Sequence, residues 1–206
     1  MTTSSKKTIV FDLGGVLIDW NPRYLFDQLF NHDADKVSYF LTHICTSAWN
    51  LEQDRGRPFK EAVEILSKQH PEFAEEISAY NTQWEQTIGG PINETVEILK
   101  QLRQAGYPVF ALTNWSAEKF SITKPKFPFL NWFEGILVSG EVKLIKPDPA
   151  IYQLLFKTFN LDPKQCIFID DSPVNIQASI AEGMPGIVFK TASQLKVALL
   201  DMHITF

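Results

Sequence analysis

The stretch TIVFDLGGVLIDW, from Thr8 to Trp20, decides the fold. Its first four residues are β-branched or aromatic, as in a short strand that is buried on both faces of a sheet. The strand ends at Asp12, and Gly14 and Gly15 follow closely. Such a sequence presents a carboxylate at the tip of a buried strand. Position 14 is a glycine, so no second acidic side chain stands two residues further on.

Four later runs share this apolar character and are bounded by turn-forming residues. Helical patterns separate them: Ile92, Val96, Leu99 and Leu102 recur at helical spacing, and similar helices are expected over 148–159 and from Ser172 to Gly183. This alternation predicts a doubly wound, Rossmann-like α/β domain with a parallel sheet, whose ligands bind at the carboxyl ends of the strands. The four runs are YPVFALT (107–113), FEGILVSG (133–140), QCIFID (165–170) and PGIVFK (185–190).

The interval after the first strand breaks this rhythm. Residues 21–89 carry no strand signal, only helical stretches over 22–30, 59–69 and 72–84. We therefore expect an all-helical cap at 21–89 and a core formed by 1–20 and 90–206. The sequence GGP at 89–91 is the expected return hinge.

The bulk composition limits the classes of function. The chain has 206 residues, 45% of them apolar, and a net charge of −5, which argues against an extended nucleic-acid or anionic-membrane surface. The N-terminus has no apolar signal segment, and no run reaches membrane-spanning length.

Cys45 and Cys166 lie far apart and are expected to be reduced and buried, as in a cytoplasmic protein. The chain is compatible with a small phosphorylated partner and with either a monomer or a homodimer.

Polar clusters follow four of the predicted elements. Taken singly, each has an ordinary explanation as a turn, a helix cap or a solvated loop. Taken together and in this order, they predict one site, because the carboxyl ends of parallel strands meet at the same edge of a sheet. The clusters are Asp12; Thr113 with Asn114; Lys146; and Asp170 with Asp171.

These residue types suit metal-assisted phosphoryl transfer. Three carboxylates and a backbone oxygen form the hard, oxygen-rich site that Mg²⁺ prefers. Lys146 is a compact cation that can neutralise a phosphoryl group and lower the pKa of Asp12. The Thr113 hydroxyl can hold a phosphate oxygen. With charge handled in this way, a carboxylate can attack phosphorus and form an aspartyl-phosphate.

The sequences FDLGGVL, LTNWS, KPDPAIY and IDDS resemble motifs one to four of the haloacid dehalogenase-like (HAD) hydrolase superfamily, and the resemblance covers the whole chain. It implies a Mg²⁺-dependent phosphatase with a helical cap. Asp12 is then the nucleophile, Thr113 and Asn114 bind substrate, and Lys146 bridges nucleophile and substrate. Asp171 is a direct metal ligand, and Asp170 assists through water. The carbonyl of Gly14 is a further ligand.

The chain departs from this pattern at position 14, where most phosphatases of that family carry an aspartate as general acid and base. General acid–base help is typically worth about 10²–10⁴ in rate, so its loss slows such a site without abolishing it. An anomeric sugar oxygen leaves easily. FDLG with a helical cap also resembles bacterial phosphatases that act on α-D-glucose 1-phosphate, so a sugar 1-phosphate is the leading substrate. Asp19 is an alternative proton donor, although a turn role suits it better.

Two other functions remain open at this point. A 2-haloacid dehalogenase also uses the first aspartate as nucleophile and needs no acid at position 14, but it needs no divalent metal and would be hindered by the acidic pair Asp170–Asp171. A non-catalytic protein of the same fold would tolerate the missing acid, but it would not need the other charged residues.

Cap residues are expected to select the substrate. The turn at Arg55-Gly56 resembles one found in the caps of related phosphatases, and Arg55 is either a substrate contact or part of a solvated turn. Lys143 either adds positive charge near the phosphate or faces solvent. Three tryptophans are candidates for a sugar-accepting face, although aromatic residues at helical spacing more often lie in a core: Trp20, Trp49 and Trp84.

Overall fold

The computed structural model describes residues 6–206, and the first part of the N-terminal segment considered above lies outside this range. Its centre is a five-stranded parallel sheet with the order β5-β4-β1-β6-β7, so the first strand lies in the middle. Strand β1 pairs with β4 on one side and with β6 on the other. The five strands are β1 (Thr8–Phe11), β4 (Val109–Thr113), β5 (Gly135–Val138), β6 (Cys166–Asp170) and β7 (Gly186–Val188).

Helices cover both faces of this sheet, and the alternation of side chains along β1 explains why. Ile9 and Phe11 belong to a core that includes α6 and α11, whereas Val10 belongs to a second core with α9 and α10. Both layers are buried, which accounts for the continuous apolar character of the strands. The core helices are α6 (Asn93–Gln104), α7 (Ala117–Thr123), α8 (Ser139–Val142), α9 (Pro149–Phe159), α10 (Pro173–Ala181) and α11 (Ala192–Asp201). The predicted doubly wound α/β fold is therefore confirmed.

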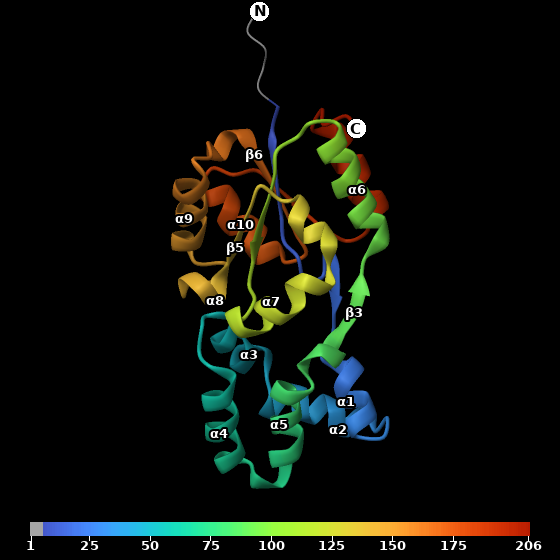
Figure 1. Cartoon of the computed structure of the whole chain (residues 1–206), viewed down its shortest axis with the longest axis vertical. Coiled ribbons are helices and arrows are strands. Elements are labelled where there is room, and N and C mark those ends of the chain that lie inside the picture. The colour runs from blue at the N-terminus through green and yellow to red at the C-terminus, as the bar shows by residue number, and fades with distance from the viewer. Residues whose placement is uncertain (1–5) are drawn as a thin grey trace, which may run out of the picture.

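A two-stranded antiparallel ribbon connects the sheet to a helical cap (Figure 1). Its strands are β2 (Ile18–Trp20) and β3 (Ile88–Pro91), with Ile18 paired to Pro91. Residues 89–91, the predicted return hinge, lie in β3, by which the chain passes from the cap back to the core. Glycine and proline are depleted in strands, so β3 carries no strand signal in the sequence and depends on pairing with β2.

All helices of the cap lie between β2 and β3 along the chain. Aromatic side chains fill its interior: the ring of Phe26 packs 4.7 Å from that of Phe40 and 5.3 Å from that of Tyr80. Trp49 joins the same cluster, with its ring 5.3 Å from Tyr80. The cap helices are α1 (Arg23–Leu29), α2 (Ala34–Tyr39), α3 (Ser47–Asp54), α4 (Phe59–Gln69) and α5 (Ala74–Thr82).

Besides the ribbon, α3 and α5 of the cap contact the core. The end of α3 lies beside α7 and α8 (Figure 1), where Ser139 Oγ donates a hydrogen bond of 2.6 Å to the carbonyl of Asp54. On α7, the amine of the buried Lys119 donates to the carbonyl and the side-chain oxygen of Asn81, at 2.9 and 2.6 Å. The cap thus sits against the carboxyl ends of the strands. No helix within residues 6–206 is long and apolar enough to span a membrane.

Candidate active site

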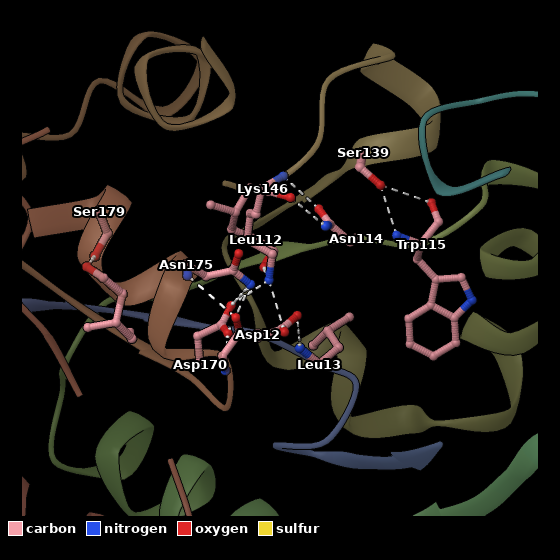
Figure 2. A network of polar contacts seen from close by, with 12 residues as sticks. Asp12, Leu13, Leu112, Asn114, Trp115, Ser139, Lys146, Asp170, Asn175 and Ser179 are labelled. Carbon is pink, nitrogen blue, oxygen red and sulfur yellow. Dashed lines mark hydrogen bonds and ion pairs between the residues drawn. The ribbon is translucent and has the colours of Figure 1, made fainter. Parts of the chain in front are cut away.

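Asp12 directly follows β1 in the middle of the sheet, and only 8% of its surface is exposed. The backbone N–H of Leu13 donates a hydrogen bond of 2.7 Å to Asp12 Oδ1. The other carboxylate oxygen, Oδ2, lies 2.9 Å from the amine of Lys146 (Figure 2). Both oxygens of this carboxylate are therefore held in place by donors.

Lys146 lies on the loop after α8 and is almost fully buried. Its Nζ forms a second ion pair of 2.7 Å with Asp170 Oδ2 and donates to the carbonyl of Leu112 at 3.1 Å. The side chain of Asn114 fixes the Lys146 backbone, since its Nδ2 donates to the Lys146 carbonyl and its Oδ1 accepts from the Lys146 N–H. Asn114 thus positions Lys146, and Figure 2 shows both contacts.

The ends of β1 and β6 bring three carboxylates together. Oxygens of Asp12, Asp170 and Asp171 all lie within 4.8 Å of one another. Asp170 is fully buried and accepts hydrogen bonds from the Ser172 N–H and from Asn175 Nδ2, at 2.8 and 3.1 Å. Asp171 is exposed. Three carboxylates facing one ammonium leave excess negative charge, which is the donor set that a divalent cation stabilises.

The charges of this cluster shift one another's pKa values. Burial, reinforced by Asp170 and Asp171, raises the pKa of Asp12 to about 7, although the charge of Lys146 opposes the rise. The expectation that Lys146 lowers the pKa of Asp12 is therefore right in sign, but burial outweighs it. Burial and the Asp170 charge also raise the pKa of Asp171. A bound divalent cation would favour the ionised form of both groups.

Thr113, the last residue of β4, is 1% exposed. Its hydroxyl oxygen is buried without a hydrogen-bond partner among residues 6–206. A buried polar group usually has a partner, so an unpaired hydroxyl at the carboxyl end of the sheet fits a ligand that supplies one. The four predicted clusters therefore converge on the carboxyl edge of β1, β4 and β6.

A pocket between cap and core opens beside Gly14. Its cavity volume is about 80 Å³. A Cβ placed on Gly14 would meet no atom within 4 Å in the described part of the chain, so this corner of the pocket is open. We call it the tryptophan pocket, and its lining residues are Gly14, Trp20, Asn50, Asp54, Trp84, Asn114, Trp115 and Ser116.

Other residues singled out in the sequence lie elsewhere. Trp49 packs inside the cap and does not line the tryptophan pocket. Arg55 is exposed, with its nearest carboxylate Glu52 at 3.7 Å. Lys143 is exposed at the end of α8. Asp19 lies in β2, so the predicted turn role is wrong; it accepts a hydrogen bond of 2.7 Å from the Tyr24 hydroxyl and does not line the pocket.

Sequence reasoning missed several residues around the site. Asn175 carries a weak signal, because it lies in the first turn of the helix that Ser172 caps. Asp54 and Asn50 carry none, since they belong to a cap helix far from the strand ends along the chain. Trp115 directly follows the predicted Thr113-Asn114 cluster and could have been included with it.

Comparison with known proteins agrees with this architecture. The family model described as haloacid dehalogenase-like hydrolase matches residues 6–183. The sesquiterpene phosphatase astK of Aspergillus oryzae is 28% identical over 184 residues, covering 88% of each chain. The HAD family enzyme bt-2542 of Bacteroides thetaiotaomicron, solved with magnesium and inorganic phosphate, superposes with a TM-score of 0.71 at 22% identity, covering 91% of this chain and 96% of that one.

A dehalogenase has a similar fold. The L-2-haloacid dehalogenase RSc1362 superposes with a TM-score of 0.64 at 22% identity, covering 89% of this chain and 86% of that one. The parallel sheet, the cap and the cluster of acidic residues at the strand ends define the class of protein as a capped α/β protein with a site at the carboxyl edge of its sheet. The chain belongs to the haloacid dehalogenase-like hydrolase family.

Proposed function

We propose that this hydrolase is a Mg²⁺-dependent phosphatase that cleaves a small phosphate monoester through an aspartyl-phosphate on Asp12. The observation that carries the proposal is the grouping of three carboxylate side chains within 4.8 Å beside a buried lysine. Phosphatase relatives and a neighbour solved with magnesium and phosphate support the same reaction. The core is assigned to 1–20 and 90–206, and the cap to 21–89.

The residues present fit a magnesium ion. Asp12, Asp171 and the carbonyl oxygen of Gly14 would hold it directly, and Asp170 would assist through water. When bound, the ion neutralises phosphate charge and aligns phosphorus with the nucleophile. Asp170 already accepts hydrogen bonds from Lys146, Ser172 and Asn175, which favours a supporting role over direct ligation.

The chain's own residues supply the remaining requirements of the reaction. The Leu13 N–H and the Lys146 amine orient the Asp12 carboxylate, so an oxygen of Asp12 can attack phosphorus in line with the leaving group. Lys146 and the unpaired hydroxyl of Thr113 would bind equatorial phosphoryl oxygens. Closure of the cap excludes water from the site while the phosphoryl group moves.

The tryptophan pocket supports a sugar phosphate as the substrate, with a sugar 1-phosphate as the leading candidate. Trp20, Trp84 and Trp115 offer aromatic faces for a sugar ring, and Asn50 offers hydrogen-bonding groups for its hydroxyls. An anomeric oxygen is also the easiest sugar oxygen to expel, which suits a site whose core side has Gly14 in place of an acid. This preference is a proposal that rests on the pocket and on Gly14.

A hydrolysis panel tests the proposal. Sugar 1-phosphates, sugar 6-phosphates, nucleotides and 2-haloacids are assayed with Mg²⁺ and with EDTA. We expect phosphate release from a sugar phosphate that EDTA abolishes and that Asp12→Asn lowers to background. Chloride release that persists in EDTA would favour a dehalogenase. Hydrolysis that survives Asp12→Asn would remove Asp12 as the nucleophile.

A further inference from the structure

The tryptophan pocket contains a carboxylate that the proposed reaction has not used. Asp54, at the end of α3 in the cap, is the one acidic residue among the described residues that line it. Gly14 lines the same pocket and leaves its corner open. An acid is therefore missing from the core side of the pocket, while another acid faces the same space from the cap side.

Several contacts fix Asp54 relative to the core. Its carboxylate accepts a hydrogen bond of 3.2 Å from Asn50 Nδ2, one turn earlier on α3. Its carbonyl accepts the 2.6 Å bond from Ser139 Oγ, which in turn accepts from the Trp115 N–H at 2.8 Å. The backbone of Asp54 is thus tied through Ser139 to Trp115, two residues after the proposed phosphate-binding Thr113, and Asn50 holds its carboxylate.

We propose that Asp54 is the general acid and base of the reaction, supplied by the cap in place of the side chain that Gly14 lacks. This proposal rests on the phosphatase function proposed above. The protonated carboxyl of Asp54 gives its proton to the leaving-group oxygen as the bond between that oxygen and phosphorus breaks and an Asp12 oxygen bonds to phosphorus.

The second half of the reaction returns the proton. A water molecule gives a proton to the Asp54 carboxylate as its oxygen attacks phosphorus, and the bond between phosphorus and the Asp12 oxygen breaks. Inorganic phosphate leaves, Asp12 is again a carboxylate, and Asp54 is again protonated. One proton thus shuttles between Asp54, the alcohol and water, and no further reactant is needed.

The surroundings of Asp54 suit a proton carrier near neutral pH. Burial raises the pKa of Asp54 to about 7, and the Ser116 backbone and the charge of Lys146 limit the rise. The Tyr80 hydroxyl also interacts with this carboxylate, and the pKa of Tyr80 is raised mainly by burial. Asp54 can therefore exist in both protonation states at neutral pH, as a general acid and base requires.

A structural role for Asp54 makes different predictions. If the carboxylate only fastens α3 to the core, its loss would weaken binding of every substrate alike. A proton donor matters most for a poor leaving group and little for a good one. The dependence of the Asp54→Asn effect on the leaving group therefore separates the two roles.

The test compares wild type and Asp54→Asn on a sugar 6-phosphate and on 4-nitrophenyl phosphate. We expect kcat/KM to fall about 10²-fold or more for the sugar 6-phosphate and to stay within about tenfold for 4-nitrophenyl phosphate. The variant also lacks the base for the attack of water, so its phosphoenzyme should be hydrolysed slowly. It should therefore release a burst of about one nitrophenol per enzyme molecule. The mass of one phosphoryl group should then be found on the peptide containing Asp12. The fall of kcat/KM for the sugar 6-phosphate above about pH 7 should vanish in the variant.

Two further variants serve as a rescue and as a control. Gly14→Asp in the Asp54→Asn background should restore part of the lost activity, because the open corner beside Gly14 accepts a side chain. Glu52→Gln, an exposed change on the same helix, should leave the kinetics unchanged. An equal loss on both substrates without a phosphoenzyme, or no loss at all, would overturn the role of Asp54. A wild-type chain without Asp12-dependent hydrolysis would instead overturn the phosphatase function, and the role of Asp54 with it.

Discussion

Lys146 shows how a single buried residue stabilises the site. Its amine is the shared partner of Asp12 and Asp170, at 2.9 and 2.7 Å, and its side chain is 1% exposed. Removing one member of a buried ion pair leaves a charge without compensation, which is far more costly than losing an exposed pair. The lysine is therefore expected to stabilise the fold as well as to bind phosphate.

We predict that Lys146→Met lowers the free energy of unfolding at pH 7 by about 3–5 kcal/mol, because Asp12 and Asp170 then face each other unpaired. Urea denaturation measures this loss. Part of it should be recovered at lower pH, where the carboxyls bind protons. Lys68→Met, which removes an exposed pair with Glu64, should change the free energy by less than about 1 kcal/mol. Equal losses in the two variants would contradict this account of Lys146.

Asp54 gives a prediction about stability that does not depend on activity. Its folded pKa of about 7 lies above the ordinary value of 3.8, so the folded state binds a proton that the unfolded state releases. The stability contributed by this proton is complete below about pH 4 and is lost as pH rises through about 7. Asp54→Asn cannot ionise and avoids this loss.

As pH rises from about 4 to about 8, the melting temperature of wild type should therefore decrease by a few degrees relative to that of Asp54→Asn. Thermal unfolding followed by circular dichroism over this range measures the difference. Asp201→Asn, an exposed change at the end of α11, should give a curve parallel to that of wild type. Parallel curves for Asp54→Asn and wild type would show that Asp54 ionises normally.

Among the elements, the end of α3 and the turn after it decide how the cap meets the core. Gly56 has a φ of +106°, and a Cβ at this position would lie 3.1 Å from the carbonyl oxygen of Gly140 in α8. The turn thus combines a backbone conformation that favours glycine with a close approach to the core. Asp54 lies only two residues earlier, so a shift of the turn moves its carboxylate.

We predict that Gly56→Ala lowers kcat/KM for the best substrate about tenfold or more, because the added methyl group pushes the cap away from α8. Steady-state kinetics measure the effect. Gly183→Ala is the matched control: its φ is also positive, at +85°, but its nearest contact is 3.8 Å away on Pro163 and it lies outside the site. Both variants should lose stability through backbone strain, whereas only Gly56→Ala should lose activity. A similar kinetic loss in both would remove the turn from substrate handling.

The elements also explain how far the sequence alone could predict this molecule. The parallel strands were predicted because burial on both faces makes them continuously apolar. The ribbon strand β3 was missed because Gly89 and Gly90 carry no such signal. Asp12, Thr113 and Asp170 could be found because each ends a predicted strand. Asp54 could not, since only the folded position of α3 brings it to the tryptophan pocket.

At the scale of the whole molecule, the topology decides which side chains of the site come from the core and which come from the cap. The strand order places β1 between β4 and β6, so residues 12, 113 and 170 meet at one edge although more than 150 positions separate the first from the last. The core thereby supplies the fixed charges. The ribbon and the cap supply Trp20, Trp84 and Asp54 to the tryptophan pocket, and this part can change without disturbing the carboxylate cluster.

The carboxylate cluster also links cation binding to the stability of the whole chain. Asp12 and Asp171 follow different strands, and the mutual repulsion of the three carboxylates is only partly offset by Lys146. A ligand that binds only the folded state stabilises it by an amount that grows with its concentration. We therefore predict that millimolar MgCl₂ raises the melting temperature of wild type by several degrees and that EDTA reverses the gain. Asp171→Asn should lose most of this gain, whereas Asp201→Asn should keep it. A gain that persists undiminished in Asp171→Asn would place the cation elsewhere on the molecule.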